Sequence, residues 1–264
     1  METGIREIFE AFQGITFTVL MWWVTISIFR RYRVTKYLPA LVVGVGFFTL
    51  GFIFAPILAL GRTLMVERPE IAGLVGPGAS LWYSLLSIVC GNAFVIGLFL
   101  FGVFTRQVFR PGSPGSLFFL IFIGIILIGS SDLIFMFEDI PISISWGACL
   151  EIKIVFTIGG ALNFGWLAYE SLSRWSIYRR QLKEGKDLDP LVVNRFLLWG
   201  LAGMSYIIAG IGGLFFEPYK AIQPLIPALT VNTCIFTFAI FSYLSWSPPG
   251  WFKRIISKEM ADQT

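Results

Sequence analysis

Residues 38–61 read LPALVVGVGFFTLGFIFAPILALG, a run that contains no charged side chain. A helix needs about 20 mostly apolar residues to cross the hydrocarbon core of a bilayer. Lipid offers no hydrogen bonds to peptide groups, so a spanning segment must satisfy them within a helix or a closed barrel. This stretch therefore predicts a membrane-spanning α-helix.

Six further segments of the chain have the same character. The 264 residues are 56% hydrophobic and only 14% charged, whereas soluble domains carry about 25% charged residues. The predicted fold is all-α, a polytopic transmembrane seven-helix bundle over residues 1–246, followed by a short amphipathic tail at 247–264. The seven predicted spans are about 11–29, 38–61, 80–104, 116–137, 147–169, 192–215 and 223–246.

Lys and Arg are distributed unevenly between alternate connections. The first, third and fifth connections, with their edges and the tail, hold 15 of the 20 basic residues, and the rest of the chain holds five. Cytoplasmic loops of membrane proteins carry the excess of Lys and Arg. We therefore expect a multi-pass protein of the plasma membrane, or of the cytoplasmic membrane in a prokaryote, with its N-terminus outside and its C-terminus in the cytoplasm.

The composition also excludes several function classes. The chain contains no His, which removes His-ligated haem, most catalytic zinc sites and nucleophiles activated by His. Its three cysteines form no CxxC pair. The formal net charge is +4, and the basic residues lie between long apolar runs. This arrangement indicates a membrane protein and not a nucleic-acid binder. The sequence predicts no catalytic residue, metal or cofactor, and the lipid bilayer is the expected partner.

Two ionisable residues, Asp132 and Lys153, fall inside predicted spans. With a rise of 1.5 Å per residue, both lie roughly 8–9 Å below the outer boundary, and this matched depth allows an ion pair. Ionisable groups in a membrane are costly and therefore functional candidates. Three interpretations stay open: the pair belongs to an outward-facing ligand or ion site, the pair only locks two helices together, or Lys153 extends outward and meets Glu138 or Asp139 instead.

Three amides, Asn92, Asn163 and Asn232, also lie inside predicted spans. Such side chains commonly join transmembrane helices, at about 0.6–2 kcal/mol per hydrogen bond. If they converge on one cavity, they instead line the same pathway as the two ionisable residues. One sequence leaves both interpretations open.

The connection at about 170–191 is the longest and most charged of the predicted cytoplasmic loops. Asp189-Pro190 predicts the start of the helix after it, with Asp as the cap and Pro at the first helical position. The tail is expected to form a short helix in the cytoplasmic interface. Basic residues in both segments are expected to contact anionic lipid headgroups or a cytoplasmic partner: Arg174, Arg179, Arg180, Lys183, Lys253 and Arg254.

The tail resembles a known class of membrane regions. It is similar to the way in which the seven-helix sensory regions of prokaryotic sensor kinases leave the membrane, in Tyr243, Leu244, Trp246, Pro248, Pro249, Trp251 and Arg254. The resemblance implies a sensory module, and because no kinase domain follows in these residues, output is expected to pass through a separate partner. Retinal proteins share the seven-span architecture, but the segment 223–246 has no Lys for a Schiff base. We therefore do not expect a retinal protein.

Three functions follow from these patterns. The first is a non-catalytic sensory or receptor-like membrane module that binds a small or lipidic ligand in its outer half and signals through a cytoplasmic partner. The second is a small transporter or channel with Asp132 and Lys153 on its path. The third is a structural subunit of a larger membrane complex, with other membrane subunits as partners. Enzymatic activity is the least favoured.

Overall fold

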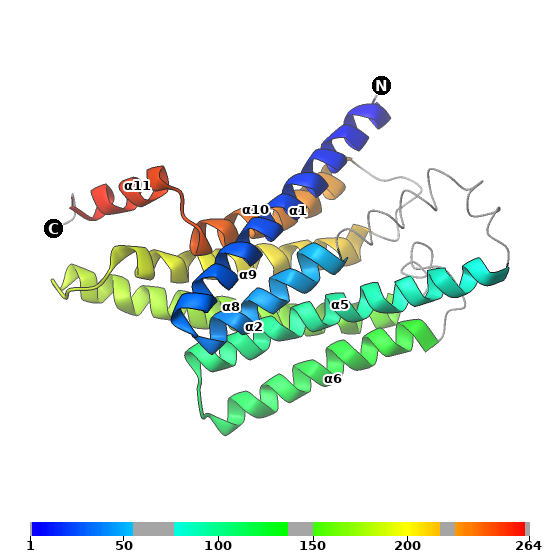
Figure 1. The fold of residues 1–264 in the computed structure, drawn as a ribbon, viewed down its shortest axis with the longest axis horizontal. Helices are drawn as coiled ribbons and strands as arrows, with labels where there is room; N and C mark the ends of the chain where they lie inside the picture. The colour runs from blue at the N-terminus through cyan, green and yellow to red at the C-terminus, as the bar shows by residue number, and fades with distance from the viewer. Residues whose placement is uncertain (1, 55–76, 137–149, 217–224, 262–264) are drawn as a thin grey trace.

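A computed structural model of the chain describes residues 2–54, 77–136, 150–216 and 225–261 (Figure 1). The regular structure in these ranges is helical throughout, which confirms the all-α fold class for them. In chain order the elements are α1 (Glu2–Thr35), α2 (Leu38–Phe48), the π-helical turn η1 (Thr49–Phe54), α5 (Pro77–Phe109), α6 (Pro114–Met136), α8 (Leu150–Lys183), α9 (Pro190–Phe216), α10 (Leu225–Trp246) and α11 (Gly250–Ala261).

Two helices in the described ranges are long and apolar enough to cross a membrane. They are Gly91–Phe109 and Pro190–Gly212. Shorter apolar helical stretches occupy Leu38–Ile53, Pro114–Ser130 and Thr233–Trp246. By length and composition the two longer helices support an association with a membrane, and the seven-span topology stays a prediction.

The prediction of a loop at about 170–191 is wrong for most of that range, because α8 continues to Lys183. No Gly or Pro interrupts the chain between Gly165 and Gly185, and Leu, Arg, Gln and Lys are good helix formers. The start of α9 agrees with the prediction. Asp189 Oδ1 accepts a hydrogen bond from the Leu191 N–H at 2.9 Å, and Pro190 is the first helical residue.

Three connections between described helices gather at one end of the molecule. Figure 1 shows the α1–α2, α5–α6 and α8–α9 connections, the last turn of α10 and all of α11 at the left of the view, whereas the N-terminus lies at the upper right. Two of these connections turn at glycines with positive φ, Gly112 at 81° and Gly185 at 78°, where the missing Cβ removes the steric penalty. Neighbouring described helices therefore run in alternating directions.

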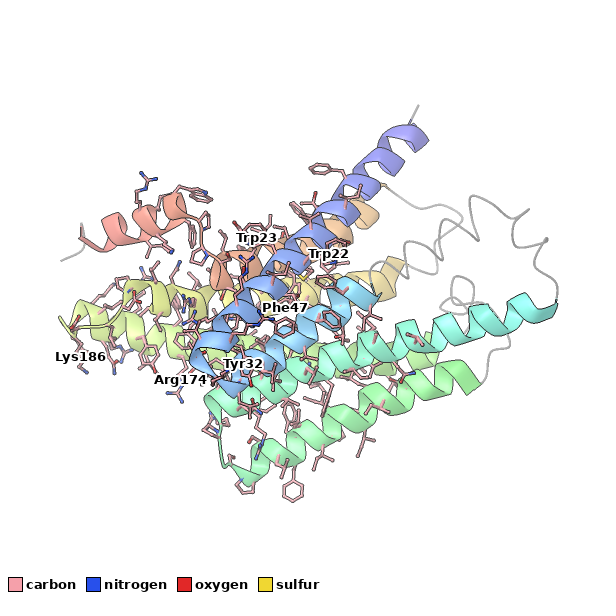
Figure 2. All side chains as sticks on the ribbon, viewed as in Figure 1. Trp22, Trp23, Tyr32, Phe47, Arg174 and Lys186 are labelled. Carbon is pink, nitrogen blue, oxygen red and sulfur yellow. The ribbon has the colours of Figure 1, made fainter. Side chains whose placement is uncertain are left out.

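Aromatic side chains from five helices meet at the centre of the bundle. The Phe47 ring of α2 lies 5.0 Å from that of Phe101 on α5, between ring centroids, and Phe101 lies 5.3 Å from Phe164 on α8. Phe164 in turn contacts Phe238 of α10 at 5.6 Å, and Phe101 contacts Trp199 of α9 at 6.2 Å. Figure 2 places Phe47 in the middle of the helices. We call these five residues the aromatic core, which explains part of the high Phe content.

Candidate functional site

The structure leaves most of the predicted outer pathway untested. Asp132 lies in α6, Lys153 in α8 and Asn232 in α10, but the side chains of all three fall outside the described part of the chain. The Asp132–Lys153 ion pair therefore stays a prediction. Asn92 lies on α5, is half-buried and is engaged in an interaction.

Asn163 joins two helices, as expected for an amide inside a span. It is fully buried on α8, and its Nδ2 donates a hydrogen bond of 2.5 Å to the carbonyl oxygen of Leu98 on α5. Gly102, one turn further along α5, leaves room for the Asn163 side chain. Helix joining is therefore the role that the structure gives to this amide.

The described basic side chains lie at the end of the molecule that holds the α1–α2, α5–α6 and α8–α9 connections. We call this end of the molecule the basic end. All fourteen Lys and Arg residues with a described side chain lie near or beyond helix ends at this place, together with four acidic residues, Glu170, Glu184, Asp187 and Asp189. Lys186 lies at the tip of the α8–α9 hairpin (Figure 2). This end therefore carries a strong positive charge.

The six predicted contact residues are all at the basic end. Arg179, Arg180 and Lys183 are exposed on the last turns of α8, and Arg174 is half-buried one turn earlier. The Arg179 guanidinium lies 5.2 Å from the centroid of the Trp175 ring, a cation–π distance. The remaining two, Lys253 and Arg254, are exposed on α11.

One ion pair connects α5 to α8 at this end. Arg110 Nε lies 2.7 Å from Glu170 Oε1, with 53% of the arginine side chain exposed and only 6% of the glutamate side chain. The hydrogen bond and the charge of Glu170 raise the pKa of the Arg110 guanidinium above its ordinary value, so that the arginine stays protonated in any physiological buffer. This pair was not predicted, because Glu170 fell at the edge of the predicted loop.

Toward the basic end from the aromatic core lie buried and half-buried polar side chains that each have a buried polar atom. On α5, Gln107 follows Phe104 by three residues, and on α9, Arg195 precedes Trp199 by four. Residues three, four or seven apart share one helix face, so both follow the aromatic face toward the basic end. Because α5 ends and α9 begins at this end, the two side chains lie at a similar level.

Helices α8 and α10 also place polar side chains on the faces that carry residues of the aromatic core. Ser171 follows Phe164 of α8 by seven residues, and Ser242 and Ser245 follow Phe238 of α10 by four and seven. The three serines are at most 1% exposed. The Trp246 ring completes the group, since its centroid lies 5.9 Å from that of Trp199. We call this group the polar cluster: Gln107, Ser171, Arg195, Ser242, Ser245 and Trp246.

Each member of the polar cluster has a buried atom without a hydrogen-bond partner in the described part of the chain. These atoms are Gln107 Oε1, Arg195 Nε, Trp246 Nε1 and the three serine hydroxyls. A buried polar group without a partner costs about 1–3 kcal/mol, and native proteins hold few of them. Six such groups on four helices, α5, α8, α9 and α10, mark the polar cluster as the candidate binding site.

The charges around the polar cluster are mostly positive. The charges of Arg31, on α1, and of Asp189 both act on Arg195. The Asp189 carboxylate already caps α9 through Leu191, and Glu170 is paired with Arg110. Arg195 makes no ion pair within the part of the chain that the structure describes. The site thus combines hydrogen-bond donors with a net positive charge, since Arg31 and Arg195 outnumber Asp189.

Sequence reasoning missed this cluster. Serine and glutamine inside a predicted span are uncharged, Arg195 was counted with the fifth connection, and Trp246 was considered only in the resemblance of the tail. A signal was available in the spacing, because each residue falls on the same helix face as a buried aromatic. Which faces point inward depends on the rotation of each helix, which the even hydrophobicity of these segments conceals.

Comparison with known proteins identifies no relative of this chain. No protein-family model, no curated protein and no solved structure matches it. The geometry of the described residues is therefore the basis for assigning a function.

Proposed function

We propose that the chain is a seven-span integral membrane protein, N-terminus outside and C-terminus in the cytoplasm, and that it acts as a non-catalytic sensory or receptor-like module. The spans would be α1, α2 with η1, α5, α6, α8, α9 and α10. The observation that carries the proposal is the distribution of basic residues in the sequence: 15 of the 20 lie in the first, third and fifth connections, their edges and the tail, and these three connections lie at the basic end (Figure 1). This is the charge distribution of a cytoplasmic face.

Exposed apolar side chains on α6 support a lipid environment around the bundle. On α6, Phe118 and Ile125 are 73% and 66% exposed, and Ile121 and Phe122 between them are exposed as well. These four residues are spaced i, i+3, i+4 and i+7 and so form one apolar stripe. A stripe of this kind is unfavourable in water and is typical of a surface that contacts lipid or another protein.

The basic end supports output through a separate cytoplasmic partner. Helices α8 and α9 form an antiparallel pair whose connection extends to the far left of Figure 1. Exposed Arg179, Arg180 and Lys183 lie near its tip. Beside it, α11 buries Ile256 and leaves Trp251 exposed. These two elements offer a mixed basic and apolar surface for an acidic partner.

Reversal of charge on this surface tests the receptor-like function. We expect a soluble signalling protein to co-purify with the full-length chain in mild detergent. In the Arg179→Glu/Arg180→Glu variant its yield should fall at least about tenfold, because like charges placed opposite one another cost several kcal/mol. The measurement is quantitative mass spectrometry of material purified from native membranes.

The matched control is Arg30→Glu/Arg33→Glu, which makes the same change in charge on exposed positions of α1 at the same end. It should keep the partner. Equal loss from both variants would contradict docking on α8. Integral membrane subunits in fixed proportion would indicate the structural role instead, and ion or solute flux in liposomes that Asp132→Asn abolishes would indicate a transporter.

A further inference from the structure

The polar cluster offers more unpartnered donors than acceptors. Arg195 Nε and Trp246 Nε1 can only donate, and the hydroxyls of Ser171, Ser242 and Ser245 can rotate to donate. These five groups come from three helices and all are buried. A bound group with several acceptor atoms would satisfy them together, whereas dry packing leaves every one of them unpaired.

The charge and shape of these donors select the acceptor. A guanidinium forms a planar fork that matches the oxygens of phosphate or carboxylate. A carboxylate has two oxygens, whereas a phosphate presents three or four to donors that approach from several helices. Gln107 Oε1, the unpartnered acceptor of the cluster, can accept from a hydroxyl of a singly protonated phosphate. The charge of Arg31 adds to the attraction.

From this arrangement we propose that the polar cluster binds a phosphate group, with Arg195 as its principal ligand. The inference rests on the proposed function, for which it supplies the class of ligand. It also moves the binding site from the expected outer half of the bundle to the basic end. There the phosphate comes either from the headgroup of a lipid in the cytoplasmic leaflet or from a soluble phosphate in the cytoplasm.

The test uses the full-length protein in micelles of a maltoside detergent, which contains no phosphate, at constant ionic strength. One arm titrates inorganic phosphate against chloride, and the other varies the fraction of phosphatidic acid in the micelle. Thermal unfolding is the readout, because a ligand that binds only the folded protein raises the apparent melting temperature. We expect a saturable rise in at least one arm. A rise with inorganic phosphate alone indicates a soluble ligand, and a rise with phosphatidic acid alone indicates a lipid headgroup.

Three variants test whether the phosphate group binds at the polar cluster. Arg195→Gln should weaken the apparent affinity at least about tenfold, the usual effect of losing a hydrogen bond from a charged donor. Arg33→Gln removes the same charge from an exposed position of α1 and should change the affinity less than about twofold. Trp246→Phe keeps a ring against Trp199 and Phe104 but removes the indole donor, and it should weaken binding about threefold to tenfold. Trp246→Phe decides the matter if Arg195→Gln does not fold.

Two results would overturn the proposal. One is the lack of a saturable shift in both arms with folded protein, and the other is equal weakening by Arg33→Gln and Arg195→Gln, which would indicate general charge attraction. Binding to purified protein depends neither on orientation nor on a partner. Loss of the cytoplasmic partner with phosphate binding intact would therefore refute the receptor-like function alone, and the reverse result would refute only the phosphate site.

Discussion

Phe101→Ala should lower the apparent melting temperature of the purified protein by at least about 6 °C. Phe101 is fully buried, and its ring contacts Phe47, Phe164, Trp199 and Phe238. Replacing a buried Phe with Ala costs about 3–5 kcal/mol, and each kcal/mol corresponds to about 2–4 °C in a protein of this size. In a bilayer the loss comes from packing and not from water, since the cavity removes contacts from rings on four helices.

Phe118→Ala is the control for this prediction. It makes the same change on the exposed stripe of α6, where the ring contacts the surroundings of the bundle. Its melting temperature should stay within about 2 °C of the wild type. Thermal unfolding of both variants in the same detergent provides the comparison. Equal losses would mean that the aromatic core does not hold the bundle together.

Gly203→Leu should destabilise the protein by about 3 kcal/mol or more. Helices α8 and α9 form the most extensive helix pair, and a Cβ on Gly203 would lie 2.8 Å from the carbonyl oxygen of Phe164 and 3.1 Å from the Cβ of Ala168. Backbone atoms cannot rotate away as a side chain does, so the two helices must separate. Overpacking of a tight contact costs about 1–3 kcal/mol and occasionally more, and a leucine exceeds the space by a whole side chain.

Gly129→Leu on α6 serves as the comparison, because a Cβ there meets nothing within 4 Å. It should leave stability unchanged or raise it slightly, since Leu is a better helix former than Gly by about 0.8–1 kcal/mol. The yield of monodisperse protein and its unfolding temperature measure both variants. Normal stability of Gly203→Leu would show that α8 and α9 do not pack through this face.

The sequence predicted the helical class and several local features for physical reasons that the structure makes clear. Long uncharged runs of about 20 residues favour helices, which satisfy their own peptide groups, and the described residues are helical wherever they are regular. The cap at Asp189 was predicted because its chemistry is local. The role of Asn163 in joining helices was one of two interpretations, and the structure supplies its partner, the Leu98 carbonyl.

Features that depend on the relation between helices were not predicted. The extension of α8 to Lys183 was missed because a charged segment was taken for a loop, although its residues favour a helix. The polar cluster depends on the rotation of α5, α8, α9 and α10 about their axes. These helices are apolar on most faces, so hydrophobic periodicity gives little information about rotation. The Asp132–Lys153 pair stays a prediction.

Cysteine labelling in intact cells tests the central claim that the basic end faces the cytoplasm. In a variant whose native cysteines are replaced, Lys186→Cys puts a thiol at the tip of the α8–α9 hairpin, and Glu67→Cys puts one in a connection predicted to lie outside. We expect a membrane-impermeant maleimide to label Glu67→Cys in intact cells and Lys186→Cys only after permeabilisation. Labelling of Lys186→Cys in intact cells would contradict the orientation, and with it the cytoplasmic partner.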